Sequence, residues 1–332
     1  MNDSDRPDEE SGIARVLKAA GGRAAPADDM KAAVRSAVHA QWHASVAKRR
    51  QRRVLVALAA SFAVAAATLW LARAYFTAPI GAVVANVSRS IGEVESSTSA
   101  WGRHSAVPQD ATVRIGETLT TGAEGLVALR LLDGVSLRLD HDTRIEFVDD
   151  SHVNLLSGAV YVDAGTTPRA SRSLRVSTPA GVVWHVGTQY EARLVNGATR
   201  IRVREGRVDL QPEQGTAQSA HVGEELLVSA SGSIERGSIS PTDPEWQWAA
   251  NAAPSFEIDG RPVHEFLVWV GREVGREIVF RTPESRAEAE RAVLSGSVDG
   301  LAPAEALDAV LPTTSLRSEQ RDGKIEISLQ SP

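Results

Sequence analysis

The residue types that could do chemistry in this chain are few and widely spaced. No cysteine occurs among the 332 residues, which excludes disulfides, thiolate metal sites and cysteine nucleophiles. The sequence has no Gly-rich phosphate loop, Gly-x-Ser-x-Gly elbow or His-Glu-x-x-His pair. The histidines beyond residue 100 form no short-spaced metal pair: His104, His141, His152, His185, His221 and His264. We therefore expect no enzyme activity, no cofactor and no metal site.

Two charged patterns remain as candidates for binding. Asp140-His141-Asp142 offers carboxylates for a divalent cation, although a polar turn between two strands explains the same residues better. The second pattern is a stripe of arginines on one face of a predicted strand, Arg200, Arg202 and Arg204. The stripe could contact an acidic partner or peptidoglycan. A solvated strand face is the more common reason for such a pattern.

An uncharged run of 18 residues, Val54 to Leu71, is the most distinctive element of the sequence. As a helix it would be about 27 Å long, close to the roughly 30 Å hydrocarbon core of a bilayer. Aromatic residues follow the run and a basic cluster precedes it, Lys48, Arg49, Arg50, Arg52 and Arg53. These flanks favour a transmembrane helix over residues 54–76. A buried soluble helix is the alternative, because many members of the run are alanine.

The distribution of charge predicts how this helix is oriented. Residues 1–53 hold 11 Lys and Arg against 7 Asp and Glu, whereas residues 77–332 hold 24 against 35. Because the basic flank of a membrane helix stays in the cytoplasm, we expect the amino terminus inside and the acidic bulk outside. The basic cluster is then a topology signal, which argues against nucleic-acid binding. A cleaved signal peptide ending near Ala72-Arg73-Ala74 is the rival, but the 53 residues before the run are too many for one.

The predicted cytoplasmic tail, residues 1–53, carries two short amphipathic helices. The first covers Ile13 to Ala20 and ends at Gly21-Gly22. The second presents an apolar residue at every fourth position, namely Met30, Val34, Val38, Trp42 and Val46. Because helices of this size cannot bury such a stripe, we expect it to bind a protein partner or the membrane surface. A juxtamembrane continuation of the spanning helix has nearly equal weight.

Short alternating apolar runs separated by turn residues fill residues 111–231, after a linker expected at 77–110. Leu126–Leu131 and Val135–Leu139 alternate with period two around Asp133-Gly134, which predicts a β-hairpin. Asn196-Gly197 marks a second hairpin. So many short strands predict a mainly β chain with an all-β domain here, a sandwich, barrel or solenoid-like fold.

Four stretches of this region resemble, in the same order, the pattern of the FecR-type domain. They are Leu132-Asp133-Gly134, Leu156 to Asp163, Val186 to Tyr190 and Val203 to Val208. Their glycines are expected where strands meet a turn, a bulge or a close backbone approach, at Gly134, Gly158, Gly187 and Gly206. These are expected to be residues of the fold and not of an active site.

Residues 232–253 are rich in Ser, Gly, Pro and Ala and are expected to be a linker, with Trp246 and Trp248 packing on a neighbouring domain. A small α+β module with the order β-α-β-β-α-β is predicted over 254–330. Its predicted elements are a strand at Phe256–Ile258, a helix at Pro262–Arg272, strands at Glu277–Arg281 and Val293–Val298, a helix at Pro303–Leu311 and a strand at Lys324–Ser328. Through Ile278–Phe280 and Leu294–Leu307 the module resembles the short N-terminal signalling (STN) domain of secretins and TonB-dependent receptors.

The FecR resemblance implies a single-pass regulator of the bacterial inner membrane. Such a protein receives a signal in the periplasm, from a TonB-dependent receptor or a similar outer-membrane protein, and binds an extracytoplasmic-function sigma factor with its cytoplasmic tail. For this chain we assign the sigma-factor contact to Met30, Val34, Val38 and Trp42 and the receptor contact to the exposed strand edge of the module. The tail departs from the family, whose members usually carry several tryptophans there. An envelope scaffold that binds cell-wall or outer-membrane components, with no role in transcription, is the alternative.

Overall fold

The computed structural model describes residues 81–98, 104–165, 173–212, 215–229 and 231–330, together with tail residues 14–16, 18, 19, 30, 32, 35 and 36. The chain divides into two compact units, Met1–Tyr75 and Phe76–Pro332. In the part of the chain that is described, no helix is both long enough and apolar enough to span a membrane. The predicted transmembrane run Val54–Leu71 lies outside the described residues.

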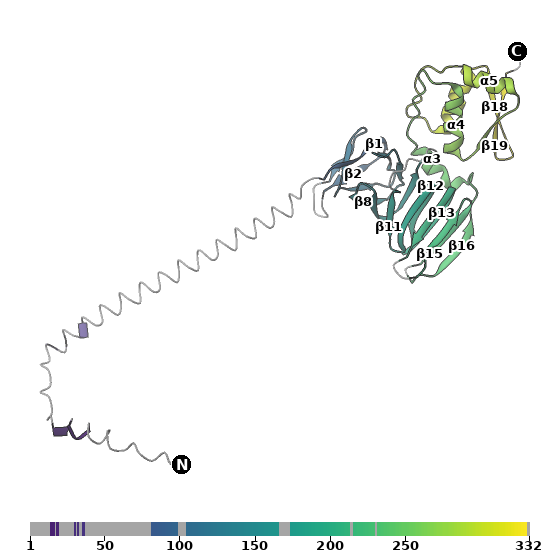
Figure 1. The fold of residues 1–332 in the computed structure, drawn as a ribbon. Helices are drawn as coiled ribbons and strands as arrows, with labels where there is room; N and C mark the ends of the chain where they lie inside the picture. Colours follow the sequence, from purple (N-terminus) through teal and green to yellow (C-terminus); the bar gives the residue numbers. More distant parts are fainter. Residues whose placement is uncertain are drawn as a thin grey trace. The chain divides into compact units, whose positions relative to one another are not determined.

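The second unit contains a large sheet of 16 strands within its described residues (Figure 1). The order is β3-β2-β5-β8-β9-β11-β12-β10-β7-β6-β1-β4; in addition β13 pairs with β12, β14 and β15, and β16 pairs with β15. The strands are β1 (Val83–Ile91), β2 (Val94–Ser97), β3 (Ser105–Ala106), β4 (Thr112–Arg114), β5 (Thr118–Thr121), β6 (Leu126–Leu131), β7 (Ser136–Leu139), β8 (Arg144–Asp149), β9 (His152–Ser157), β10 (Ala159–Asp163), β11 (Arg175–Thr178), β12 (Gly181–Val195), β13 (Ala198–Gln211), β14 (Gln218–His221), β15 (Glu224–Val228) and β16 (Ile234–Ser238). The prediction of an all-β domain is therefore confirmed.

Both predicted hairpins are present, because their turn residues fit the backbone that a hairpin needs. Strands β6 and β7 pair around Asp133-Gly134, with Gly134 at a φ of 92°. The long strands β12 and β13 pair around Asn196 and Gly197, whose φ values of 49° and 79° are both left-handed. Two left-handed turn residues match the twist of the flanking strands. Figure 1 shows β12, β13, β15 and β16 side by side as one continuous surface.

The prediction of linkers at 77–110 and 232–253 is wrong, because both segments contain strands of the sheet. Strand β1 lies between β6 and β4, and β2 and β3 extend the sheet beyond β5. In the second segment β16 pairs with β15, and the short helices η1 (Pro244–Trp246) and α3 (Gln247–Asn251) follow. The packing predicted for the tryptophans is confirmed, since Trp246 is buried and its ring meets that of Tyr161 edge-on at 6.0 Å.

The C-terminal module has its own hydrophobic core and a three-stranded sheet, ordered β17-β19-β18. Its elements are α4 (Val263–Val274), β17 (Glu277–Phe280), α5 (Pro283–Arg291), α6 (Pro303–Val310), η2 (Leu311–Thr313), β18 (Leu316–Arg321) and β19 (Lys324–Leu329). The apolar stripe of α4 contributes Phe266, Leu267 and Val270 to this core. The helix ends at Gly275, whose left-handed φ of 67° lets its N–H bond to carbonyls of the last turn.

The predicted order β-α-β-β-α-β is wrong, and the observed order is α-β-α-α-β-β. Residues 256–258 form no strand, and within 293–298 only Val293 makes a single bridge, to Pro262. Those apolar residues anchor a loop, since Leu294 is buried and exchanges backbone hydrogen bonds with residues 260 and 261. Helix α5 and strand β18 were not predicted, because both are strongly charged and expose most of their side chains.

We expect Gly206→Ala to lower the free energy of unfolding by about 2–4 kcal/mol. Gly206 lies in β13 at a φ of 77°, and a Cβ there would be 2.6 Å from the carbonyl oxygen of Gly187 and 2.7 Å from Thr188 Cγ2. Gly116→Ala is the matched control, because Gly116 has a φ of 84° but nothing within 4 Å of its Cβ position. The free energy of unfolding of Gly116→Ala should fall only by the cost of the left-handed backbone, about 1–2 kcal/mol. Denaturant titration compares the variants, and equal losses would contradict the close approach.

Candidate functional site at the junction of the sheet and the module

Charged side chains from four elements meet where the large sheet contacts the C-terminal module. We call this group the junction cluster: Arg138 from β7, Asp163 from β10, Arg204 and Glu205 from β13, and Arg272 and Glu273 from α4. Arg138 is 1% exposed and Glu273 is 4% exposed. Burial of charge at this level is tolerated only when the charges are paired and hydrogen-bonded.

Arg138 and Glu273 form a two-point ion pair at the centre of the cluster. Arg138 donates from Nη1 to Glu273 Oε2 at 2.7 Å and from Nη2 to Glu273 Oε1 at 2.8 Å. Its Nη1 also donates to the carbonyl of Ala249 at 2.7 Å, and its guanidinium lies 5.1 Å from the ring centre of Tyr161. Burial alone would lower the pKa of Arg138, but the Glu273 carboxylate raises it above its usual value. The guanidinium therefore remains charged in the interior.

Asp163 and Arg272 form a second pair beside the first. Arg272 Nη2 donates to Asp163 Oδ1 at 2.5 Å, and Gln189 Nε2 donates to Asp163 Oδ2 at 3.0 Å. Arg272 also pairs with Glu205. Burial alone would raise the pKa of Asp163, but the hydrogen bond and charge of Arg272 and the charge of Arg138 hold it below its usual value. Helix α4 therefore presents two neighbouring residues of opposite charge to two complementary partners on the sheet.

Two further arginines bind main-chain carbonyls across the junction. Arg204 donates from Nε to the carbonyl of Pro241 and from Nη1 to the carbonyl of Glu273, both at 2.9 Å. Because Glu273 is in the last turn of α4, Arg204 places its charge at the negative end of that helix. Arg89 on β1 donates to the carbonyls of residues 253, 300 and 301 at 3.1–3.3 Å. The module is thus joined to the sheet mainly by arginine.

The arginine stripe on β13 is neither a solvated face nor a free binding surface, because Arg202 and Arg204 are buried. Arg202 donates to Glu225 at 2.5 Å and also pairs with Glu245, and Arg200 pairs with Glu191 at 3.3 Å. The indole of Trp248 donates to the same Glu191 at 2.9 Å. The segment from Ile239 to Ala253 therefore covers the stripe.

The cation site considered at Asp140-His141-Asp142 has a different explanation. Asp140 is buried and pairs with Arg193 at 2.5 Å, whereas His141 is exposed. No group of three or more His, Asp or Glu residues in the described part of the chain is arranged to hold a metal ion.

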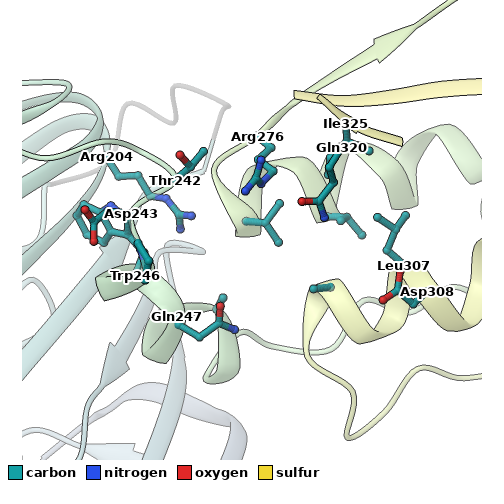
Figure 2. Close-up of a pocket in the computed structure, with 15 residues that line it drawn as sticks. Arg204, Thr242, Asp243, Trp246, Gln247, Arg276, Leu307, Asp308, Gln320 and Ile325 are labelled. Carbon is teal, nitrogen blue, oxygen red and sulfur yellow. The ribbon is translucent and has the colours of Figure 1, made fainter. Parts of the chain in front are cut away.

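A cleft of about 280 Å³ opens between the segment covering the stripe and the module. Figure 2 shows Arg204, Trp246 and Gln247 on one wall and Arg276, Gln320 and Leu307 on the other. The aliphatic part of the lining is contributed by Val270, Val274, Leu307 and Ile325. The cleft is therefore built from β13, η1, α3, α4, α6 and the small sheet.

The residues that the sequence assigned to partner binding lie elsewhere in the chain. Met30 is helical and 60% exposed, whereas Val34, Val38 and Trp42 lie outside the described residues, as does the basic cluster from Lys48 to Arg53. Those assignments remain predictions.

The junction cluster itself was missed, although the sequence holds a signal for two of its members. Arg138 interrupts the apolar strand Ser136–Leu139, and Glu273 lies on the apolar stripe of α4, three residues after Val270. A charged residue at a position expected to be buried indicates a buried partner.

The model of the FecR protein family matches residues 117–209, the range that carries the sheet side of the junction cluster. Two crystal structures of a proposed anti-sigma factor from Parabacteroides distasonis, at 1.65 and 2.50 Å, are 17% identical to this chain. The aligned region is 64% of this chain in both cases, and it is 99% of the first crystallised chain and 97% of the second. The TM-scores are 0.35 and 0.33. Likeness at that level assigns neither partner nor function. No curated protein matches the chain.

We expect Arg138→Met to lower the free energy of unfolding by about 3–5 kcal/mol, because Glu273 is left buried without a counter-charge. The double variant Arg138→Met/Glu273→Leu should lose less than the sum of the two single variants. Arg286→Met is the control, because Arg286 and Glu290 form an exposed pair on α5, and it should change stability little. Denaturant titration measures the free energy of unfolding of the parent, of both single variants, of the double variant and of the control. Additive losses in the double variant would contradict a coupled pair.

The lowered pKa of Asp163 predicts how stability depends on acid. A carboxyl whose folded pKa lies below its unfolded value of about 3.9 stabilises the fold above that pH and stops doing so as the pH falls through the folded value. Stability should therefore decline below about pH 4, and Asp163→Asn should flatten part of that decline. Asp110→Asn, at an exposed turn, is the matched control and should leave the profile unchanged. Unfolding is measured at intervals between pH 3 and 6, and identical profiles for Asp163→Asn and the parent would refute the assignment.

Proposed function

We propose that the protein is a FecR-type regulator that links a periplasmic signal to a cytoplasmic sigma factor, because its residues 117–209 match the model of the FecR protein family. In this proposal the run Val54–Leu71 crosses the inner membrane once. The tail then lies in the cytoplasm, and the sheet and the module lie in the periplasm. The basic cluster before the run supports this orientation.

The match to the FecR family model is the observation that carries the proposal, and the junction supports it. A relay needs two separate binding ends and a chain between them whose states the two partners favour differently. The module and the FecR domain are joined through Arg138 and Glu273, so a partner bound to the module is mechanically connected to the sheet. The proposed tail contact at Met30, Val34, Val38 and Trp42 supplies the other end.

The proposed contact with a TonB-dependent receptor, or a similar outer-membrane protein, uses an edge of the small sheet. Strands β17 and β18 are its two edges, and each pairs only with β19 among the described residues. Strand β18 carries alternating charges at Arg317, Glu319 and Arg321, which protect an edge against strand addition. Strand β17 is mainly apolar and half-exposed, so we favour β17 as the edge to which a receptor strand adds.

We also propose that the protein acts by binding alone. The sequence holds no catalytic or phosphate-binding motif, and the charged groups of the junction are used in pairs that hold elements together. The sigma factor and the receptor are then the partners that define its activity.

The test of this proposal is recovery of a sigma factor with the full chain. We expect the parent protein, purified in detergent from its own host, to bring down an extracytoplasmic-function sigma factor. Trp42→Ala should reduce the recovered amount about tenfold or more, because buried tryptophans dominate such contacts. Gln41→Ala, next to the stripe but outside it, is the matched control and should bind normally.

A promoter read by that sigma factor gives a second readout in living cells. Its activity should respond to Trp42→Ala and not to Gln41→Ala. If the parent chain recovers no sigma factor and Trp42→Ala leaves the promoter unchanged, the regulator proposal fails and the envelope scaffold is favoured.

A further inference from the structure

The cleft between the stripe-covering segment and the module contains two arginines without a carboxylate partner. Four other buried or half-buried arginines of the sheet and of α4 are paired with carboxylates: Arg138 with Glu273, Arg193 with Asp140, Arg202 with Glu225 and Arg272 with Asp163. Arg204 and Arg276 both line the cleft. Among the described residues neither forms an ion pair, and the side chain of Arg276 makes no hydrogen bond either.

Arg204 is held in a fixed position, although its charge is not neutralised. It is 4% exposed, its Nε and Nη1 bind the carbonyls of Pro241 and Glu273, and its guanidinium lies 5.4 Å from the ring centre of Trp246. Its Nη2 has no hydrogen-bond partner in the described part of the chain. Figure 2 shows the Arg204 and Arg276 side chains extending into the same space from opposite walls. A pre-positioned planar donor of this kind suits a carboxylate.

The rest of the lining suits a peptide. The aliphatic lining includes Val274 and Leu307 and can take an apolar side chain. Gln320 offers its amide group to a peptide main chain from one wall, and Gln247, whose Nε2 donates to Asn251, offers its amide oxygen from the other. Asp243 and Asp308 also line the cleft. Asp243 accepts the N–H of Glu245 at 2.9 Å, whereas Asp308 lies beside Leu307 on the wall opposite Arg204. These two carboxylates disfavour multiply charged phosphates, and Asp308 can accept a peptide N–H.

We propose that this cleft binds a peptide carboxylate next to an apolar side chain, with Arg204 and Arg276 holding the carboxylate. The carboxylate comes from an acidic side chain or from a chain terminus. The inference rests on the proposed function only in giving the periplasmic partner a second point of contact, distinct from the β17 edge. The sigma-factor contact of the tail does not depend on it.

The experiment uses the full chain in detergent and three probe peptides. Acetyl-Leu-Glu-amide carries a side-chain carboxylate, acetyl-Ala-Leu carries a terminal carboxylate, and acetyl-Ala-Leu-amide carries none. Methyl resonances of Val274 and Leu307 report binding in the cleft. We expect at least one carboxylate peptide to shift both resonances at an affinity about tenfold or more above that of the amide, because hydrogen bonds to charged groups are the stronger ones. Which of the two binds identifies the source of the carboxylate.

Variants separate the anion contact from general packing. Arg276→Ala should weaken the binding of the carboxylate peptide about tenfold and leave the binding of the amide peptide unchanged. Arg204→Lys, which keeps the charge but removes the planar guanidinium, should also weaken the binding of the carboxylate peptide. Arg317→Ala, which removes an arginine of the module outside the cleft, is the matched control.

Equal binding of carboxylate and amide peptides, no binding of any probe, or unchanged binding in folded Arg276→Ala would each overturn the inference. Normal recovery of the sigma factor in the same Arg276→Ala protein distinguishes a failure of this site from a failure of the proposed regulator.

Discussion

The ion pair of Arg138 and Glu273 is the constraint on which the second unit depends. Taking two charges out of water costs several kcal/mol for each ion, and only close and multiple hydrogen bonds offset that cost. The pair therefore fixes the position of α4 against β7 within narrow limits. Its neighbours conform to that position: Arg272, the preceding residue of the helix, binds Asp163, and Arg204 on β13 donates to the carbonyl of Glu273. An apolar contact of equal area would tolerate sliding, whereas these directional bonds do not.

Strand β13 of the β12–β13 hairpin presents apolar side chains on one face of the sheet and arginines on the other. Ile201 and Val203 point into the hydrophobic core, and the alternate residues Arg200, Arg202 and Arg204 point to the other face. That face would hold three neighbouring positive charges if water alone covered it. Glu191, Glu225 and Glu245 neutralise the first two arginines, and the last of these carboxylates is supplied by the segment that crosses the face. The segment is therefore folded because it completes an electrostatic layer, although its composition is typical of a linker.

Features set by local chemistry could be predicted from the sequence, and features set by distant partners could not. The hairpins at Asp133-Gly134 and Asn196-Gly197, the helix α4 with its apolar stripe and the burial of Trp246 all follow from a few adjacent residues. Strand β1 was missed because its partners in β6 lie about 40 residues away in sequence. Helix α5 has no apolar stripe, and its signal is the capping box at Thr282 and Ser285, which precedes a charged run. The junction cluster joins residues 135 and 109 positions apart, so local patterns can mark Arg138 and Glu273 as charges at buried positions but cannot identify their partners.

That long separation also sets the order in which the protein can be completed. Arg138 is synthesised well before Glu273, so for part of its synthesis the sheet holds an arginine whose counter-charge does not yet exist. Until α4 arrives, β7 must leave this side chain in water or remain incompletely packed. A chain cut short before residue 273 is therefore a destabilised protein and not a smaller stable one, and proteases that remove unfolded chains would act on it. The last quarter of the sequence thus completes the charge pairing of the sheet that precedes it.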